Sequence, residues 1–308
     1  MRLGCWIIAG ALLCGALEGC GGSDAVDGAA DPAAVPQLRR DGAFLVDEQN
    51  RVVMLHGVNA VWKLKPYAPP DSAEGFTAAD ADWLQAHGFN AVRLGVLFAG
   101  VMPQQGVVDS GYLVQIDRVV QLLAARRIWV LLDFHEDMYN EKFYGEGFPD
   151  WAVYDDGVPL PVDAGFPGNL FQPATSITYD NLWNNKNKLW DYYRQAWAAV
   201  AAKWARQPYL MGYELINEPW PGTNYVTCFP PLGCAGFDEN KLQPMQTDML
   251  DGIRQQDASN LVWYEPLVLI SYAAPTYLGA RTPVADANLG FSWHLYCPTT
   301  TLPLGLNT

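Results

Sequence analysis

The feature that most constrains the fold is a regular alternation of apolar and amphipathic segments along the chain. Short runs rich in β-branched and aromatic residues predict strands over residues 52–59, 90–96, 128–134, 209–216, 261–264 and 290–295. Between them, apolar residues at helical spacing predict helices over residues 77–87, 113–123, 189–204 and 242–253. Strands that alternate with helices form a parallel sheet covered by helices, so we predict an α/β fold.

Two parallel architectures fit this alternation, an open doubly wound sheet and a closed barrel. A doubly wound dinucleotide site would show a GxGxxG turn after its first strand, and this sequence contains none. Polar residues instead follow several different strands, which is where barrel enzymes carry their chemistry. We therefore predict a (β/α)8 TIM barrel that is incomplete, with about six of eight strands present.

Length and charge limit the domain count and the partners. The 308 residues are 50% hydrophobic, which suffices for one large core. The net charge of -14 would repel a phosphate backbone, so we expect no nucleic-acid partner. A neutral or weakly charged substrate fits this composition better.

The N-terminal segment predicts export. Arg2 precedes an apolar run over residues 3–17 that is too short for a normal membrane span. The run ends in Leu17-Glu18-Gly19-Cys20, which resembles a bacterial lipobox, so we predict a signal peptide of lipoprotein type over residues 1–20 with lipidation at Cys20. Cleavage without lipidation and a true membrane helix are the alternatives. We expect a protein that is secreted or lipid-anchored on the bacterial cell envelope.

The rest of the chain divides into a linker and a folded domain. Residues 21–36 are Gly, Ala, Asp and Pro with almost nothing to bury, which predicts a flexible linker, and residues 37–308 form the incomplete barrel domain. Cys228 and Cys234 lie close together in a Pro/Gly loop, which in an exported protein predicts a local disulfide. Cys297 is left without an assigned partner.

The strongest chemical signal is Ile216-Asn217-Glu218-Pro219 at the end of the fourth predicted strand. A carboxyl group walled by apolar residues can hold a proton near neutral pH and donate it to a leaving oxygen. Asn217 can hydrogen-bond a sugar hydroxyl beside the reacting carbon. The alternative for this tripeptide alone is a structural turn that caps the strand.

Further polar residues end other strands and favour the chemical interpretation. Arg93 ends the second strand, where it can orient a carboxylate, and His135 ends the third. His294 and Tyr296 share one face of the sixth strand. Glu265 ends the fifth strand, and we expect it to bind substrate or orient a neighbour; its use as a second catalytic carboxylate is the weaker alternative.

Other chemistries lack their motifs. The sequence has no HExxH, no GxSxG and no phosphate loop. A metal site built from His135, Glu136 and Asp137 is disfavoured because adjacent strand residues point in opposite directions. We expect no metal and no cofactor.

These residues together resemble glycoside hydrolase family 5. Arg93, His135, the Asn217-Glu218 pair, His294 and Tyr296 match the family's pattern in order and by strand. Within the family the chain resembles the endoglycoceramidase branch, through the segments 56–63 (HGVNAVWK), 133–139 (DFHEDMY), 143–151 and 291–298. The resemblance covers residues 52–298.

The resemblance implies a retaining glycoside hydrolase on a (β/α)8 barrel. Glu218 would be the general acid/base, while Lys63, Asp137 and Asn217 would bind sugar hydroxyls. His135, His294 and Tyr296 would surround the reacting centre. The implied reaction cleaves the bond between sugar or oligosaccharide and ceramide in glycosphingolipids, so the implied partners are such a substrate, or another β-glycoside, and a membrane surface.

The sequence departs from the family in two ways. The family often has Gln where this chain has Glu136. The family's nucleophile is a Glu that ends the seventh strand, and a Trp ends the eighth; we find neither in this chain, nor the family's small C-terminal β-domain. We therefore expect these 308 residues to be inactive alone.

Other functions remain open at this point. Another β-glycanase or a glucosylceramidase of family 5 is one alternative. A non-catalytic glycan- or glycolipid-binding protein is another, if the chain truly ends at Thr308. The aromatic loop over residues 138–151 either lines a groove for a lipid tail, which would indicate a glycolipid enzyme, or packs on its own aromatic side chains.

Overall fold

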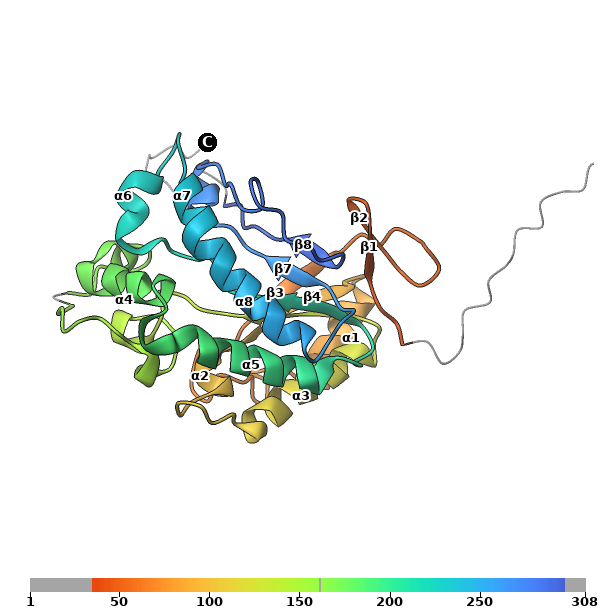
Figure 1. Cartoon of the computed structure of the whole chain (residues 1–308). Coiled ribbons are helices and arrows are strands. Elements are labelled where there is room, and N and C mark those ends of the chain that lie inside the picture. The colour runs from red at the N-terminus through yellow and green to blue at the C-terminus, as the bar shows by residue number, and fades with distance from the viewer. Residues whose placement is uncertain (1–34, 161, 297–308) are drawn as a thin grey trace, which may run out of the picture.

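The structure is a computed structural model that describes residues 35–160 and 162–296 (Figure 1). The predicted signal peptide over residues 1–20, its lipidation site Cys20, nearly all of the linker 21–36 and Cys297 lie outside the described residues. No helix in residues 35–160 and 162–296 combines the length and the apolar character that a membrane crossing requires.

Six parallel strands form one sheet in sequence order, each paired with the next along the chain. They are β3 (Gly57–Ala60), β4 (Ala91–Val96), β5 (Trp129–Phe134), β6 (Leu210–Glu214), β7 (Val262–Tyr264) and β8 (Leu289–Phe291). A doubly wound sheet reverses direction at a switch point, whereas a barrel wall adds each strand beside the last. The described residues therefore confirm the predicted TIM-barrel architecture with six strands.

The helices pack on the outside of this sheet. The four expected helices are present as α1 (Ala78–Ala86), α3 (Ser110–Ala124), α5 (Leu189–Trp204) and α8 (Gln243–Arg254). Figure 1 shows α5 and α8 side by side across the outer face of the sheet. The start of α1 is capped, since the Asp80 carboxylate accepts the Thr77 N–H at 2.7 Å, and Gly88 follows the helix with φ +78°.

The segment between β5 and α5 is more ordered than the sequence suggested. It contains α4 (Pro173–Trp183), which lacks an amphipathic pattern because its buried residues lie on several sides of the helix. Shorter helices also follow the strands, at α2 (Phe98–Val101), α6 (Tyr225–Cys228) and α7 (Ala235–Phe237). Single 3-10 turns cover Glu141–Phe143, Asp150–Ala152, Gly168–Phe171, Lys186–Lys188, Gly222–Asn224 and Val268–Tyr272, and a π turn covers Asp238–Leu242.

The first predicted strand is shorter than expected and has a neighbour that the sequence did not reveal. Residues 52–59 were expected to form it, but β3 begins at Gly57. The preceding residues run beside a hairpin of β1 (Arg39–Asp41) and β2 (Phe44–Val46), where the Val53 N–H donates to the Leu45 carbonyl at 2.8 Å. Backbone pairing with the hairpin therefore takes up Val52 and Val53, the first two residues of the predicted strand.

Each buried strand presents one side to the helices and the other to the barrel interior. On β5, Phe134 faces outward and stacks on Trp197 of α5 with ring centroids 3.8 Å apart. Trp129 and Leu131 face inward, where they form a smaller apolar cluster with Leu38 beside the hairpin. Because both sides are buried, the strand is apolar without alternation.

A register shift in β6 decides which of its residues reach the interior. The pairing with β5 moves from Leu210 to Gly212, so Met211 forms a bulge. Gly212 has φ +131°, and an added Cβ would lie 2.1 Å from the Leu261 carbonyl oxygen, so glycine is required there. As a result Met211 and Glu214, three residues apart, both face inward.

Candidate active site

Glu218 follows β6 in a left-handed backbone conformation, with φ +42°. Its Oε1 lies 2.6 Å from His294 Nδ1 and also accepts a hydrogen bond from the Tyr296 hydroxyl. Both partners follow β8, and Glu265, which accepts the Glu218 N–H, follows β7. The residues around Glu218 therefore come from the ends of three consecutive strands, β6, β7 and β8. The Glu218 side chain is 9% exposed, which places it at the mouth of the strands without open contact with bulk solvent. Strained backbone at such a position is typical of functional residues.

Glu265 follows β7 and supports the backbone of Glu218. Its Oε1 accepts the Glu218 N–H at 3.1 Å. The backbone of Glu265 is fixed by Gln246 of α8, which accepts its N–H at 3.1 Å and donates to its carbonyl oxygen at 2.6 Å. Burial raises the pKa of the Glu265 carboxyl well above its usual range, and the nearby Glu214 charge raises it further. This carboxyl is 1% exposed and belongs to the support of the site.

Arg93 was expected to end its strand, but it lies inside β4, three residues before the strand ends, and so beneath the site, as the central cation of a buried cluster. Its Nη1 lies 2.9 Å from Asp133 Oδ2, its Nε donates to Glu214 and its Nη2 donates to Asn217 Oδ1 at 2.9 Å. Glu265 Oε2 lies 3.9 Å away. Burial alone lowers the pKa of Arg93, but the surrounding carboxylates raise it overall, so the guanidinium stays charged. The expected contact with a carboxylate is present, spread over several partners.

His135 follows β5 and carries a positive charge near neutral pH. Its Nδ1 lies 2.8 Å from Asp133 Oδ2, while its Nε2 faces Asp137 at 3.6 Å and Glu146 at 3.9 Å. Burial lowers the pKa of the imidazole, but the Asp133 charge more than compensates, and the pKa rises to about 9. The opposite effect acts on Asp137, where burial raises the pKa but His135 and then Lys63 bring it down to about 2.

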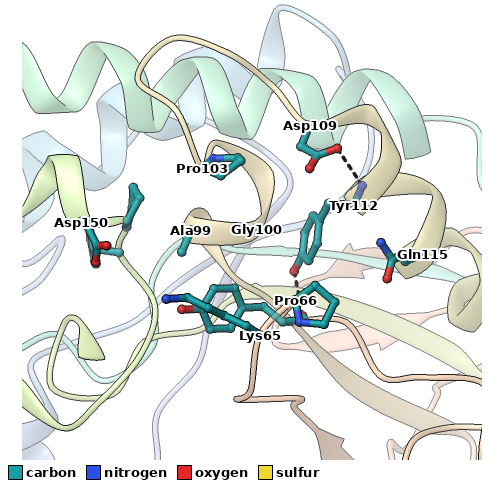
Figure 2. A pocket seen from close by; sticks show the side chains of 12 residues that line it. Lys65, Pro66, Ala99, Gly100, Pro103, Asp109, Tyr112, Gln115 and Asp150 are labelled. Atoms are coloured by element: carbon teal, nitrogen blue, oxygen red, sulfur yellow. Dashed lines mark hydrogen bonds between the residues drawn. The ribbon is translucent and has the colours of Figure 1, made fainter. Parts of the chain in front are cut away.

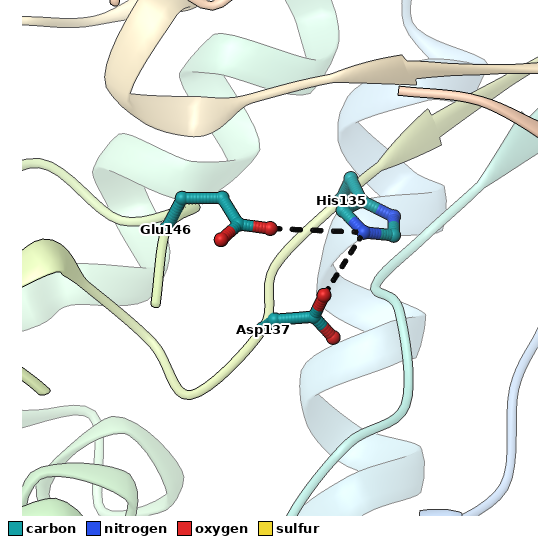
Figure 3. Close-up of side chains that lie close together, drawn as sticks. All are labelled: His135, Asp137 and Glu146. Carbon is teal, nitrogen blue, oxygen red and sulfur yellow. Dashed lines mark ion pairs between the residues drawn. The ribbon is translucent and has the colours of Figure 1, made fainter. Parts of the chain in front are cut away.

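Glu146 is a member of this group that the sequence interpretation missed. Figure 3 shows it beside His135 and Asp137. The Lys63 ammonium pairs with Asp137 and lies 3.0 Å from Glu146 Oε1. Although three such side chains can hold a metal ion, the Lys63 ammonium already provides the cation between the two carboxylates.

Two glycines explain how Glu146 is placed. They are also the feature of the sequence that could have indicated a close backbone approach at Glu146. The backbones of Asp137 and Glu146 exchange hydrogen bonds of 3.0 and 2.9 Å, which closes the loop between them. A Cβ at Gly145 would lie 1.7 Å from the Asp137 carbonyl oxygen, and one at Gly147, where φ is +129°, would lie 2.3 Å from the Glu136 Cβ. The Gly145-Glu146-Gly147 motif is thus a requirement of close backbone approach.

All eight residues that the sequence analysis assigned to catalysis or substrate binding line one polar cavity. The cavity has a volume of about 530 Å³. Its lining includes Lys63, Arg93, His135, Asp137, Asn217, Glu218, His294 and Tyr296. The remaining lining residues are Asn59, Val61 and Leu295. Tertiary structure therefore brings together residues from four strand ends and from the interior of β4 that are up to 233 positions apart in the sequence.

An apolar groove of about 60 Å³ adjoins this cavity, and the two share Asp137, Glu218 and Tyr296. The other groove residues are mostly apolar: Glu136, Met138, Phe166, Pro167, Leu170, Phe171, Tyr179, Trp220, Val268 and Tyr272. Of the aromatic loop over residues 138–151, only Met138 reaches the groove. Tyr139, Phe143 and Phe148 are buried, and Tyr139 stacks on Phe148 at 4.0 Å. Most of this loop therefore packs on its own aromatic side chains, as one of the two alternatives predicted, and does not line the groove.

A separate cavity of about 320 Å³ lies between the loops after β3, β4 and β5 (Figure 2). Lys65, Tyr112 and Asp150 are among its lining residues. Its polar groups already have partners, since the Tyr112 hydroxyl accepts the Leu97 N–H at 2.9 Å and Lys65 pairs with Glu141 at 2.6 Å. None of the eight residues of the polar cavity lines it.

Elsewhere the structure joins Cys228 and Cys234 by a disulfide, at the loop where the sequence predicted one. The bond links α6 to the residue before α7.

Comparisons with known proteins agree with this geometry. The sequence model of the family described as Cellulase (glycosyl hydrolase family 5) matches residues 46–302. Endoglycoceramidase I of Rhodococcus hoagii is 39% identical over 85% of this chain and 53% of its own length. An endoglycoceramidase of Cyanea nozakii is 33% identical over 82% of this chain and 55% of its own length. The chain thus spans about half the length of these curated relatives.

A solved structure shows the same arrangement of elements. It is endo-glycoceramidase II from a Rhodococcus species in a ganglioside GM3 complex, with a TM-score of 0.71 and 29% sequence identity. The match covers 82% of this chain and 59% of that chain.

Proposed function

This chain belongs to glycosyl hydrolase family 5, and we propose that the whole protein is a retaining glycoside hydrolase that cleaves glycosphingolipids. The bond cleaved would join the sugar or oligosaccharide to ceramide. The relatives that carry the name endoglycoceramidase, and the solved relative in complex with a ganglioside, support this substrate class.

The main support for the proposal is that a polar cavity and an apolar groove adjoin at Glu218. The polar cavity and the apolar groove share Glu218, Asp137 and Tyr296. A glycolipid has the same division, because its glycosidic oxygen joins a hydroxyl-rich glycan to an apolar tail. With the glycan in the cavity and the ceramide in the groove, the glycosidic oxygen would lie beside the Glu218 carboxyl.

Glu218 would act first as the acid and then as the base. It would protonate the ceramide oxygen while a carboxylate nucleophile attacks the anomeric carbon, and it would then deprotonate the water that hydrolyses the glycosyl-enzyme. The contacts from His294 and Tyr296 fix the acid for both steps. Retention requires a second carboxyl about 5–5.5 Å from the first.

We assign the nucleophile to none of the described residues. Glu265 is the nearby carboxylate, but its Oε1 accepts the Glu218 N–H, and it is buried beside the Arg93 cluster. A carboxyl group that supports the acid from below is poorly placed to attack a sugar in the cavity above it. Glu265 is therefore a positioning residue in this proposal.

Lys63, Asp137 and Asn217 would recognise sugar hydroxyls. Lys63 and Asp137 form an ion pair at the cavity wall, which offers both a donor and an acceptor. Asn217 is more constrained than expected, because its Oδ1 accepts from Arg93 and its Nδ2 donates to the Glu136 carbonyl oxygen at 2.8 Å. The second amide N–H of Asn217 and one acceptor site of its Oδ1 remain for a ligand.

The test is hydrolysis of a glycosylceramide by the whole protein and by Glu218→Gln. The substitution keeps the shape of the side chain but removes the proton donor, so we expect a loss of about 10²–10⁴ in kcat. Glu141→Gln is the matched control, because this exposed carboxylate pairs with Lys65 outside the site. Hydrolysis of cellulose with no action on glycolipids would instead identify a β-glycanase. Binding of glycolipid without turnover would identify a non-catalytic binding protein.

We further propose that the protein is exported and held at the bacterial cell envelope through lipidated Cys20, which would bring it to a membrane surface. The apolar run that ends in Leu17-Glu18-Gly19-Cys20 supports this proposal. Mass spectrometry of the mature N-terminus tests it, since acylated Cys20 would be the first residue. An unmodified N-terminus would contradict lipidation.

A further inference from the structure

Glu136 lies between two residues of the polar cavity but points away from them. His135 and Asp137 face that cavity, whereas Glu136 lines the apolar groove on the other side. It is 2% exposed, so its carboxyl group is a buried polar group in the wall of the groove. Glu218 lines the same groove.

The hydrogen bonds of Glu136 gather on one oxygen. Its Oε2 accepts the Tyr139 N–H at 2.9 Å and the Tyr179 hydroxyl at 2.6 Å. Within residues 35–160 and 162–296, no hydrogen bond reaches Oε1. Both of these donors contact Oε2, so a proton on Oε1 leaves the two hydrogen bonds unchanged and points away from them.

The surroundings of Glu136 also disfavour a negative charge. The nearby cations are already paired, His135 with Asp133 and Lys63 with Asp137. Burial has the largest effect and raises the pKa of the Glu136 carboxyl well above its usual range. The charge of Asp137 adds to this effect, and the hydrogen bonds from Tyr179 and Tyr139 and the charge of His135 oppose it without cancelling it. The titratable groups that face Glu136 are His135, Asp137, Tyr139, Tyr179 and Tyr193.

We propose that Glu136 determines specificity for the leaving group by donating a hydrogen bond from a neutral carboxyl group into the apolar groove. The ligand chemistry it fits is an apolar chain that carries an uncharged acceptor, such as an amide carbonyl, near its attachment to the sugar. This inference rests on the proposed function, because it deepens the recognition of the aglycone beside Glu218.

A binding comparison with two ligands tests the role of Glu136. The 308-residue chain is titrated in a calorimeter with a short-chain N-acyl glucosylceramide, and with an alkyl glucoside that has no amide. Glu136→Met replaces the carboxyl group by an apolar side chain of similar size. It should weaken binding of the glucosylceramide about threefold to tenfold, the net worth of one hydrogen bond, and leave the alkyl glucoside within about twofold.

Glu136→Gln is the matched variant, because its amide has an oxygen to accept from Tyr139 and Tyr179 and an N–H to donate into the groove. It should bind both ligands as the wild type does. An equal loss for the two ligands in Glu136→Met, or a loss in Glu136→Gln as large as in Glu136→Met, would overturn the proposal.

Infrared spectroscopy provides a readout that needs no ligand. The wild type at pH 7 should show the carbonyl band of a protonated carboxyl group that is missing in Glu136→Gln. Identical spectra would overturn the proposal even if Glu136→Met did not fold. If the wild type bound neither ligand although the band was present, the proposed function would fail, and with it the role of Glu136 in aglycone choice. If the wild type bound both ligands and Glu136→Met had no effect on binding, the role assigned to Glu136 would be wrong, and the proposed function would be unaffected.

Discussion

Replacing Arg93 by methionine removes from a buried cluster the cation that contacts Glu214, and it leaves Asp133 with His135 alone, so its effect can be worked out from the structure. The Arg93 side chain is 11% exposed, and those of Asp133 and Glu214 are fully buried. Removing one partner of a buried charge pair costs about 3–5 kcal/mol, because the other charge stays buried without compensation. A typical domain has a free energy of unfolding of about 5–15 kcal/mol, so Arg93→Met should remove a large part of it.

Urea unfolding followed by circular dichroism at pH 7 measures this loss. In a thermal scan at the same pH, the melting temperature should fall by about 6–20 °C. Arg281→Met is the matched control, because its ion pair with Glu239 lies at the surface, with side chains 67% and 33% exposed. That control should stay within about 1 kcal/mol of the wild type.

The pH dependence of the Arg93→Met deficit distinguishes electrostatics from lost packing. The pKa values of the Glu214 and Glu265 carboxyls are raised in the folded protein, first by burial. A carboxyl group with a raised folded pKa contributes stability below its unfolded pKa of about 4.3 and loses it as the pH rises. Loss of Arg93 enlarges this effect, so the deficit should shrink between pH 7 and pH 4.5. A deficit under about 1 kcal/mol at pH 7, or one that does not change with pH, would refute the reasoning.

Three further outcomes are expected from the same structure. The pKa of His135 is about 9 in the folded protein, so the charged imidazole contributes up to about 3 kcal/mol to the free energy of unfolding. This contribution is complete below pH 6.5 and is lost as the pH rises to 9. In His135→Asn, the urea midpoint should therefore change less with pH between about 6.5 and 9 than it does in the wild type. Gly147→Ala should cost about 2–4 kcal/mol, because its Cβ would meet Glu136, whereas Gly157→Ala, with open space around it, should cost about 1 kcal/mol in the same unfolding assay. Cys228→Ser opens a loop of six residues and should cost about 2 kcal/mol, and a reductant should lower the stability of the wild type but not of this variant.

Periodicity alone was sufficient for most of the fold. The helices α3, α5 and α8 were predicted because one face of each is buried against the sheet, and burial on one face produces the 3.6-residue pattern. The same reasoning could not find α4, since a helix buried on several sides has no such pattern. It also misassigned residues 52–56 as the start of a strand, because Val52 and Val53 pair with the hairpin and the His56 carbonyl accepts the Asn90 N–H.

The site was predictable where its residues follow strands directly. Parallel strands end at one edge of the sheet, so His135, Glu218 and His294 had to lie near one another once the sheet was known, whereas Arg93 lies inside β4 and reaches this edge through its long side chain. Glu146 and the groove residue Phe171 lie in long connections between elements. The glycines beside Glu146 indicate a close backbone approach but do not identify the segment that is approached, and Phe171 has no such signal, which is why both escaped prediction.

The sequence by itself determined the parallel sheet, the outer helices and the family of the chain, because burial and close packing leave a periodic record in residue types. Only the tertiary structure decided the charge states and the shape of the site. The register shift at Met211 turned Glu214 toward Arg93, and the return of Glu146 to Asp137 enclosed Lys63 between two carboxylates. These outcomes depend on distances of a few ångströms between residues far apart in the chain, and neighbouring residue types do not encode such distances.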